Sequence, residues 1–236
     1  MSDPFLWLPQ PKYSLDHVRG LALGAPYQMV WWSGRFADSH CDDYDYRAGG
    51  FGSKRDLKKF WGITGRDDAM MTMRALLDGM HAPEMDEALA TALPFRRETP
   101  DRQAELVQLV GRQSGPAAAQ AVSETLMALS RPAMPELIPP TTCAWDLTRM
   151  AMLARRSVAH GWCTPDDVLP LLQRAVDIGR QRVGGWPEYG ASYVVGRALW
   201  CADEGPADVD ESLEIHLPLV RMLLTDPNSP WNRLAW

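Results

Sequence analysis

The chain has 236 residues, of which 46% are hydrophobic and 23% are charged, and its formal net charge is -6. These values are ordinary for a soluble globular protein and fit one large domain. A net negative charge argues against broad binding of nucleic acid or anionic membranes, because both need a basic surface. The Arg155-Arg156 pair leaves a local basic patch open.

The sequence shows no signal for a membrane or for export. No apolar run approaches the roughly 18 residues of a membrane span, and the N-terminus lacks the basic and apolar regions of a signal peptide. We therefore expect a cytoplasmic protein with no membrane partner. No Cys-x-x-Cys pair occurs, so unpaired core thiols are expected at Cys41, Cys143, Cys163 and Cys201.

The N-terminal part has weak periodicity. Ser14 predicts the cap of a helix that runs through Ala22 and ends near Gly24. The segment from Tyr27 to Phe36 is apolar and aromatic, and its pattern does not separate a helix from a strand. The acidic and glycine-rich segment from Asp38 to Gly52 predicts a loop.

Helical patterns dominate from residue 53 onward. Ser53 with Asp56, and Thr64 with Asp67, resemble capping boxes. The second of these precedes an amphipathic face made of Ala69, Met70, Met73, Leu76, Leu77 and Met80. Further helix starts are predicted by Pro83, Thr99-Pro100 and Gly115-Pro116. Four prolines then indicate a linker over residues 131–140 that crosses the surface between two helical layers.

Two long helices are predicted after the linker. Thr141 or Thr142 caps the first, which ends at Gly161. Thr164 opens the second, in which Pro170 predicts either a kink or a later start, because a proline lacks the N–H that a helix interior uses.

The last helices carry glycines and a proline. Pro187 opens a helix that contains Gly190 and Gly196, each less favourable than Ala by roughly 1 kcal/mol. We expect such glycines where another backbone approaches closely. A final helix over Asp208 to Leu224 has a second kink at Pro218, and the tryptophans of the tail are expected to fold back and pack.

Together these patterns predict an all-α fold. We expect a single compact multi-helix domain of about eight to ten helices with a less regular N-terminal segment. In this interpretation residues 1–52 form an extension packed on the body, and residues 53–236 form the helical domain.

Four blocks of this sequence resemble a known bacterial family, catalogued as domain of unknown function 1266. They are FWGITGRDDAMMTMRALLDGM, AWDLTRMAMLARRSVAHGW, WPEYGASYVVGRALW and DPNSPWNRLAW, and they occur in the family's order over about residues 57–236. The resemblance implies a mostly helical protein and supplies no reaction. Pro170 and Pro218 depart from the helix formers usual in the family. The residues that carry the structural motif are Trp61, Trp145, Trp186, Trp200, Asp226, Pro230, Trp231 and Trp236.

One group of polar residues is a candidate binding site. Asp146 and Arg149 are three apart, and Tyr193 and Arg197 are four apart, so each pair shares a helix face. If the two helices pack together, a polar cleft would form from Asp146, Arg149, Glu188, Ser192, Tyr193 and Arg197. Guanidinium groups there would bind an anion or a peptide. The alternative is a partly buried ion-pair network that sets helix register.

Other candidate sites are weaker. The run His40-Cys41-Asp42-Asp43 has residue types that suit a metal, but contiguous residues rarely reach one ion, so no metal or other cofactor is expected. Cys163 lies near His160 and a helix start that would lower its thiol pKa, yet the surrounding turn favours simple packing. Gly49 to Gly52 does not match a phosphate loop. The methionine row favours an adaptable core over a peptide groove.

These observations leave two hypotheses for function. The first is a non-catalytic protein–protein interaction module that would serve as an immunity or accessory protein for an antagonistic effector. Its acidic residues at Asp42 to Asp45 and Asp203 to Glu214 would steer a basic partner toward it. The alternative is an enzyme or small-ligand binder that uses the cleft around Asp146, Arg149 and Arg197.

Overall fold

A computed structural model of the chain describes residues 4–30, 40–44 and 54–236. In chain order its helices are α1 (Leu15–Leu23), α2 (Ala25–Val30), α3 (Lys54–Trp61), α4 (Arg66–Leu77), α5 (Ala82–Ala92), the 3-10 helix η1 (Leu93–Phe95), α6 (Pro100–Ser114), α7 (Pro116–Leu129), α8 (Cys143–Ala159), α9 (Pro165–Arg182), α10 (Trp186–Trp200), α11 (Pro206–Thr225) and α12 (Pro230–Arg233). Ten of the α-helices have at least eight residues. Within the described ranges the β-type pairing is limited to one bridge between Leu6 and His40. The all-α prediction is confirmed.

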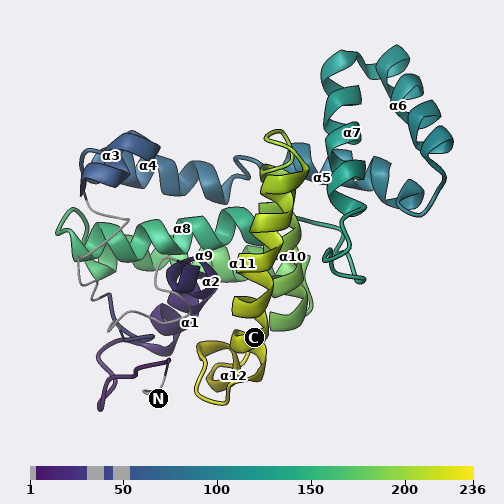
Figure 1. Cartoon of the computed structure of the whole chain (residues 1–236). Coiled ribbons are helices and arrows are strands. Elements are labelled where there is room, and N and C mark those ends of the chain that lie inside the picture. Colours follow the sequence, from purple (N-terminus) through teal and green to yellow (C-terminus); the bar gives the residue numbers. More distant parts are fainter. Residues whose placement is uncertain (1–3, 31–39, 45–53) are drawn as a thin grey trace.

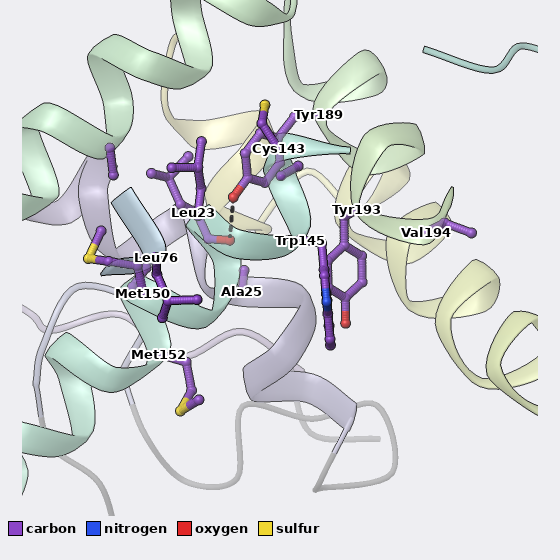
Figure 2. Packing of buried hydrophobic residues seen from close by; sticks show 14 of the residues in the cluster. Leu23, Ala25, Leu76, Cys143, Trp145, Met150, Met152, Tyr189, Tyr193 and Val194 are labelled. Atoms are coloured by element: carbon purple, nitrogen blue, oxygen red, sulfur yellow. Dashed lines mark hydrogen bonds between the residues drawn. The ribbon is translucent and has the colours of Figure 1, made fainter. Parts of the chain in front are cut away.

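Helix α8 lies at the centre of the fold. Every residue from Cys143 to Ser157 is buried, because α1, α2, α4, α5, α9 and α10 all pack against this helix. Figure 1 shows α4 running alongside α8. A helix that is buried all round needs a partner for each polar side chain. The hydroxyl of Thr148, for example, donates to the carbonyl of Leu23 at 3.1 Å, and the hydroxyl of Tyr189 donates to the same carbonyl (Figure 2).

The central position of α8 also accounts for its two adjacent arginines. Arg155 and Arg156 are only 3% and 1% exposed. Arg155 donates to the carbonyls of His40 and Cys41, both at 2.9 Å, and to that of Asp43. The pair therefore forms no basic patch on the surface, a possibility that the sequence left open, and the guanidinium of Arg155 fastens an N-terminal segment to the core.

Helix α10 approaches α8 and α11 at two glycines. A Cβ at Gly196 would lie 2.7 Å from the Cβ of Trp145 and 3.1 Å from the carbonyl oxygen of Thr142. A Cβ at Gly190 would lie 2.7 Å from Cγ1 of Val220. The expectation of a close backbone approach is therefore confirmed at Gly196, whereas a side chain is the neighbour at Gly190.

The C-terminal tail folds back and packs, as predicted. Trp186 stacks on Trp231 with ring centroids 5.2 Å apart, and it meets Trp236 edge-on at 4.6 Å. The indole N–H of Trp231 donates to the carbonyl of Ala22 at 2.9 Å. This aromatic cluster ties α12 and the tail to both α1 and α10.

Several predicted helix starts are confirmed by their caps. The side chains of Ser14, Thr99 and Thr164 each accept a hydrogen bond from the backbone N–H three residues later. Helix α9 begins at Pro165, so the later start near Pro170 is wrong. Pro170 lies inside α9, and Pro218 lies inside α11.

The predicted capping box at Thr64 and Asp67 is wrong. The N-cap of α4 is Gly65, and Thr64 bonds instead to the carboxylate of Asp68, which accepts from its amide at 2.9 Å and its hydroxyl at 2.6 Å. Met80, placed on the α4 face by its spacing, lies beyond the last residue of that helix, Leu77, and is 42% exposed.

Parts of the N-terminal predictions fall outside the described residues. The apolar segment from Tyr27 is helical as far as Val30, where the description stops. Ser53, the glycines of residues 49–52 and most of the predicted loop also lie outside it.

Helices α6 and α7 form a hairpin at the end of the molecule away from α1 (Figure 1). The proline-rich segment 131–140 leads from this hairpin back to α8 without forming a helix. The guanidinium of Arg96 ties the end of α7 to the middle of the segment, because it donates to the carbonyls of Leu129 at 2.9 Å and Pro135 at 3.1 Å.

Candidate functional site

A cleft of about 530 Å³ opens where α2, α3, α4, α8 and α10 meet. Its volume lies within the range of roughly 300–1,000 Å³ that is usual for small-molecule sites. The cleft is lined by Tyr27, Phe60, Trp61, Thr72, Met80, His81, Trp145, Arg149, Arg197 and Trp200.

Asp146 lies behind the cleft wall and is 1% exposed. Its carboxylate accepts from the backbone amides of His81 at 2.9 Å and Ala82 at 3.0 Å, at the N-terminus of α5, and from Nη2 of Arg149 at 2.5 Å. Burial on its own would raise the pKa of Asp146, but hydrogen bonds from His81 and Ala82 and the charge of Arg149 hold that pKa below its usual value. Asp146 is therefore ionised and favourably placed at a helix N-terminus.

Helices α5 and α8 cap each other. While Asp146 of α8 accepts the first amides of α5, Asp86 of α5 accepts from the amide of Thr142 at 2.6 Å and from the hydroxyls of Thr141 and Thr142 at 2.7 and 2.8 Å. Thr142 is the N-cap residue of α8. The two carboxylates fix the start of each helix against the other, and this places His81 at the edge of the cleft.

His81 bridges the buried ion pair. Its Nδ1 lies 2.7 Å from Nη2 of Arg149 and 3.2 Å from Oδ1 of Asp146. With a proton on Nδ1 the ring donates to Asp146, and without one it accepts from Arg149. Burial lowers the pKa of Arg149, while the charge of Asp146 opposes that effect.

The cationic groups of the cleft alternate with indole rings. The guanidinium of Arg149 lies 5.6 Å from the ring centroid of Trp61 and 4.4 Å from that of Trp145. The guanidinium of Arg197 lies 5.4 Å from Trp145 and 5.0 Å from Trp200. The order is thus Trp61, Arg149, Trp145, Arg197, Trp200, with cation–π attraction at each step.

Arg197 differs from Arg149 in its partners. It is half-buried and donates from Nη1 to the sulfur of Cys201, and no carboxylate pairs with it in the described part of the chain. Two more donors of this region, Nε of Arg149 and Nε1 of Trp145, are buried without a hydrogen-bond partner. The groups named here that have no partner among the described residues are thus donors.

Besides Asp146, three of the six predicted cleft residues do not line the cleft. Ser192 and Tyr193 are fully buried behind it, where Ser192 accepts from the amide of Ala144 at 3.2 Å. The hydroxyl of Tyr193 and Nδ1 of His216 share a hydrogen bond of 2.8 Å, and burial raises the pKa of Tyr193 and lowers that of His216 to about 3. The ring of Tyr193 lies beside Trp145 (Figure 2).

The third of these, Glu188, belongs to the other end of α10. Its carboxylate accepts from the amide of Gly184 at 2.6 Å. Nine helical positions separate it from Arg197, which is roughly 13 Å along the axis. The structure therefore brings Asp146, Arg149 and Arg197 together and leaves Glu188 as a local contact at the start of its helix.

Sequence reasoning missed His81, and it did not include Tyr27, Phe60 or Met80 in the cleft. The available signal was the Ala82-Pro83 helix start, because the amides there need an acceptor from elsewhere in the chain. Nothing in the local sequence identifies Asp146 as that acceptor.

The residues of the sequence motif divide between two regions. Trp61, Trp145 and Trp200 line the cleft, and Trp186, Trp231 and Trp236 form the aromatic cluster of the tail. Asp226 and Pro230 shape the turn into α12, where Oδ1 of Asp226 accepts from the amide of Asn228 at 2.8 Å.

The other candidate groups have structural partners. Asp42 accepts from the amide of Leu8 at 3.0 Å, and Asp43 pairs with Lys12 at 3.1 Å. Across the described ranges no group of three or more His, Cys, Asp or Glu side chains is arranged to hold a metal ion. None of the four cysteines forms a disulfide, and all four are buried. Burial, followed by the charge of Asp167, raises the pKa of Cys163, so the prediction that the helix start lowers it is wrong.

Comparison with known proteins gives relatives without an assigned role. The uncharacterized protein YbeR of Escherichia coli (strain K12) is 28% identical over 169 residues, which cover 72% of this chain and 63% of YbeR. The uncharacterized protein YbeU of the same organism is 28% identical over 145 residues, covering 61% of this chain and 57% of YbeU. The matched region is thus less than two thirds of either relative's length. No solved structure matches the chain.

In the described residues, no helix is both long enough and apolar enough to cross a membrane. Residues 56–236 match the family described as "Protein of unknown function (DUF1266)", in agreement with the four sequence blocks, and the chain belongs to that family.

Proposed function

We propose that this protein is a binding protein whose cleft holds an anionic group of its ligand on Arg197. The observation that carries the proposal is a half-buried arginine with no carboxylate partner among the described residues, on the wall of a cleft of about 530 Å³. A partly desolvated charge is unfavourable unless it is paired. An anion in the cleft would supply the missing partner.

The neighbouring groups support an anion over a cation. The unpaired buried donors, Nε of Arg149 and Nε1 of Trp145, both need an acceptor, and no acidic side chain lines the cleft among the described residues. Asp146 is turned away into its bonds with α5 and Arg149. A cationic ligand would meet two guanidinium groups and no free carboxylate.

The test uses one aromatic ring with four head groups: benzoate, phenyl phosphate, benzamide and benzylamine. Binding to the wild type, Arg197→Gln and Arg180→Gln would be measured by isothermal titration calorimetry, after far-UV circular dichroism has shown that each variant is folded. Arg180 is an exposed residue of α9, so its replacement removes the same charge from a different surface.

We expect at least one of the two anions to bind the wild type and Arg180→Gln, and to bind Arg197→Gln about tenfold more weakly or worse, because a charge-assisted hydrogen bond contributes roughly 1.5–3 kcal/mol. A preference for benzylamine, or anion binding that is the same in Arg197→Gln, contradicts the proposal.

Binding of a basic partner protein is the second candidate function. The acidic surface that this chain offers for it is smaller than the sequence indicates. Asp42 and Asp43 are buried, so they do not contribute to it. The favourable observation is a set of exposed carboxylates near the start of α11, namely Asp203, Glu204, Asp208, Glu211 and Glu214. Reversing Glu211 and Glu214 to Lys should weaken binding of a basic partner recovered from the native cell, and unchanged binding contradicts this candidate.

A further inference from the structure

The cleft wall carries one surplus positive charge. Asp146 neutralises Arg149, whose Nη2 lies 2.5 Å from its carboxylate, whereas Arg197 has no such partner among the described residues. A ligand with a single negative charge balances the charge of Arg197. A ligand with two or more would bring unpaired negative charge into a protein whose net charge is already -6.

The donors that phosphate groups use most readily are already occupied. Phosphates bind to free backbone amides at helix N-termini. The helix N-terminus at this cleft is that of α5, and the amides of His81 and Ala82 both donate to Asp146. A phosphate at the start of α5 would therefore meet two amides that are already bonded.

The free edge of Arg197 suits a carboxylate. Nη1 is taken by the sulfur of Cys201, which leaves Nε and Nη2 without a described hydrogen-bond partner. These two donors lie side by side on a planar group and match the spacing of the two oxygens of a carboxylate.

The apolar side chains that line the cleft favour a ligand with a flat apolar body. Three large apolar side chains of the cleft are unusually exposed: Phe60 at 52%, Trp200 at 46% and Met80 at 42%. Exposed apolar residues that gather at one place mark binding surfaces. Aromatic rings pack well against other planar rings, and Trp200 is also the indole that lies next to Arg197.

We infer that the ligand is a monocarboxylate with an aromatic or similarly flat apolar body, its carboxylate on Nε and Nη2 of Arg197 and its body against Trp200 and Phe60. This inference rests on the proposed anion-binding function and narrows it to one class of ligand. A free aromatic acid and the C-terminal residue of a peptide both have this chemistry.

The experiment measures binding by isothermal titration calorimetry at neutral pH with five probes. Indole-3-acetate and its neutral isostere indole-3-acetamide differ in the charge of the head group. Adenosine monophosphate represents a ring with a dianionic phosphate. The peptide Ala-Ala-Ala-Trp, with a free or an amidated C-terminus, distinguishes a chain end from a free acid. The proteins are the wild type, Arg197→Gln, Trp200→Ala and the control Arg180→Gln.

We expect indole-3-acetate, the free-acid peptide or both to bind the wild type at least tenfold more tightly than the matching amide. Arg197→Gln should lose that tenfold preference, Trp200→Ala should weaken both the acid and the amide, and Arg180→Gln should behave as the wild type. Tighter binding of the free acid identifies a small molecule as the source, and tighter binding of the peptide identifies a chain end.

Three results overturn the inference. If adenosine monophosphate binds more tightly than every carboxylate and depends on Arg197, the cleft binds anions but not this class. If the amides bind as well as the acids, the carboxylate is not recognised. If no probe binds at millimolar concentration, the inference of a monocarboxylate ligand is wrong. The proposed anion-binding function is then decided by whether phenyl phosphate binds in the experiment described under that proposal.

Discussion

Replacing Gly196 by Ala tests the packing that creates the cleft. In a helix interior this substitution on its own stabilises by up to about 1 kcal/mol, because Ala is the better helix former. In α10 the new Cβ would lie 2.7 Å from the Cβ of Trp145, 3.1 Å from the carbonyl oxygen of Thr142 and 3.2 Å from the Cβ of Thr142. None of these atoms can move by a side-chain rotation, since a Cβ and a carbonyl oxygen are fixed by the backbone of α8 and of its N-cap residue Thr142.

Overpacking of this kind destabilises by about 1–3 kcal/mol, so it should outweigh the gain in helix propensity. We expect Gly196→Ala to lower the free energy of unfolding by about 1–2 kcal/mol in urea titrations followed by circular dichroism. The matched control is Gly111→Ala in α6, whose Cβ would meet only the Cβ of Ala119 at an ordinary 3.4 Å. That variant should be stabilised by up to about 1 kcal/mol. If Gly196→Ala is as stable as the wild type or more stable, the close approach of α8 and α10 is not as described.

Two further predictions concern buried ionisable groups. Burial, followed by the charge of Arg197, lowers the pKa of His216 from 6.5 to about 3. Between these two pH values His216 is protonated in the unfolded chain and neutral in the folded protein. The free energy of unfolding should therefore fall as the pH drops from about 6.5 toward 3. In urea titrations at several pH values, His216→Asn should show a weaker dependence of this free energy on pH. If the variant has the same pH dependence as the wild type, the prediction is contradicted. Asp146→Asn should destabilise by about 3 kcal/mol, since it leaves Arg149 buried without its counter-charge. The control is Glu136→Gln, which breaks the exposed ion pair of Glu136 and Arg97 and should change the free energy of unfolding by less than about 0.5 kcal/mol. If both variants lose the same amount of stability, burial does not determine the cost of breaking an ion pair here.

The helices were predictable because their signals are local. Caps at Ser14, Thr99 and Thr164 depend on a hydroxyl and an amide three residues apart, and all three are present in the structure. The error at Thr64 has a local cause as well. Thr64 bonds to the carboxylate four residues on, and the helix begins after Gly65. Competing carboxylates at Asp67 and Asp68 make such a boundary uncertain from sequence.

The cleft was only partly predictable, because helix spacing gives the face of a residue but not its partner. The three-residue spacing correctly paired Asp146 with Arg149. The same kind of argument placed Ser192 and Tyr193 beside Arg197, although both turn into the core. The burial of a side chain on α10 depends on how closely this helix packs against α8 and α11. Gly190 and Gly196 set that distance through contacts with residues distant in sequence.

The difference between the two arginines of the cleft is partly local and partly tertiary. Each lies a few residues from a tryptophan on a buried helix, and each guanidinium packs on two indoles. Arg149 is neutralised by Asp146, which lies three residues earlier on the same helix and is held in place by the first amides of α5. The acid of α10, Glu188, lies nine residues before Arg197, and no carboxylate of another described element reaches Arg197, so its positive charge is left over. Mutations of Asp146 should consequently alter stability and ligand selectivity together, whereas mutations of Arg197 should alter selectivity with little loss of stability.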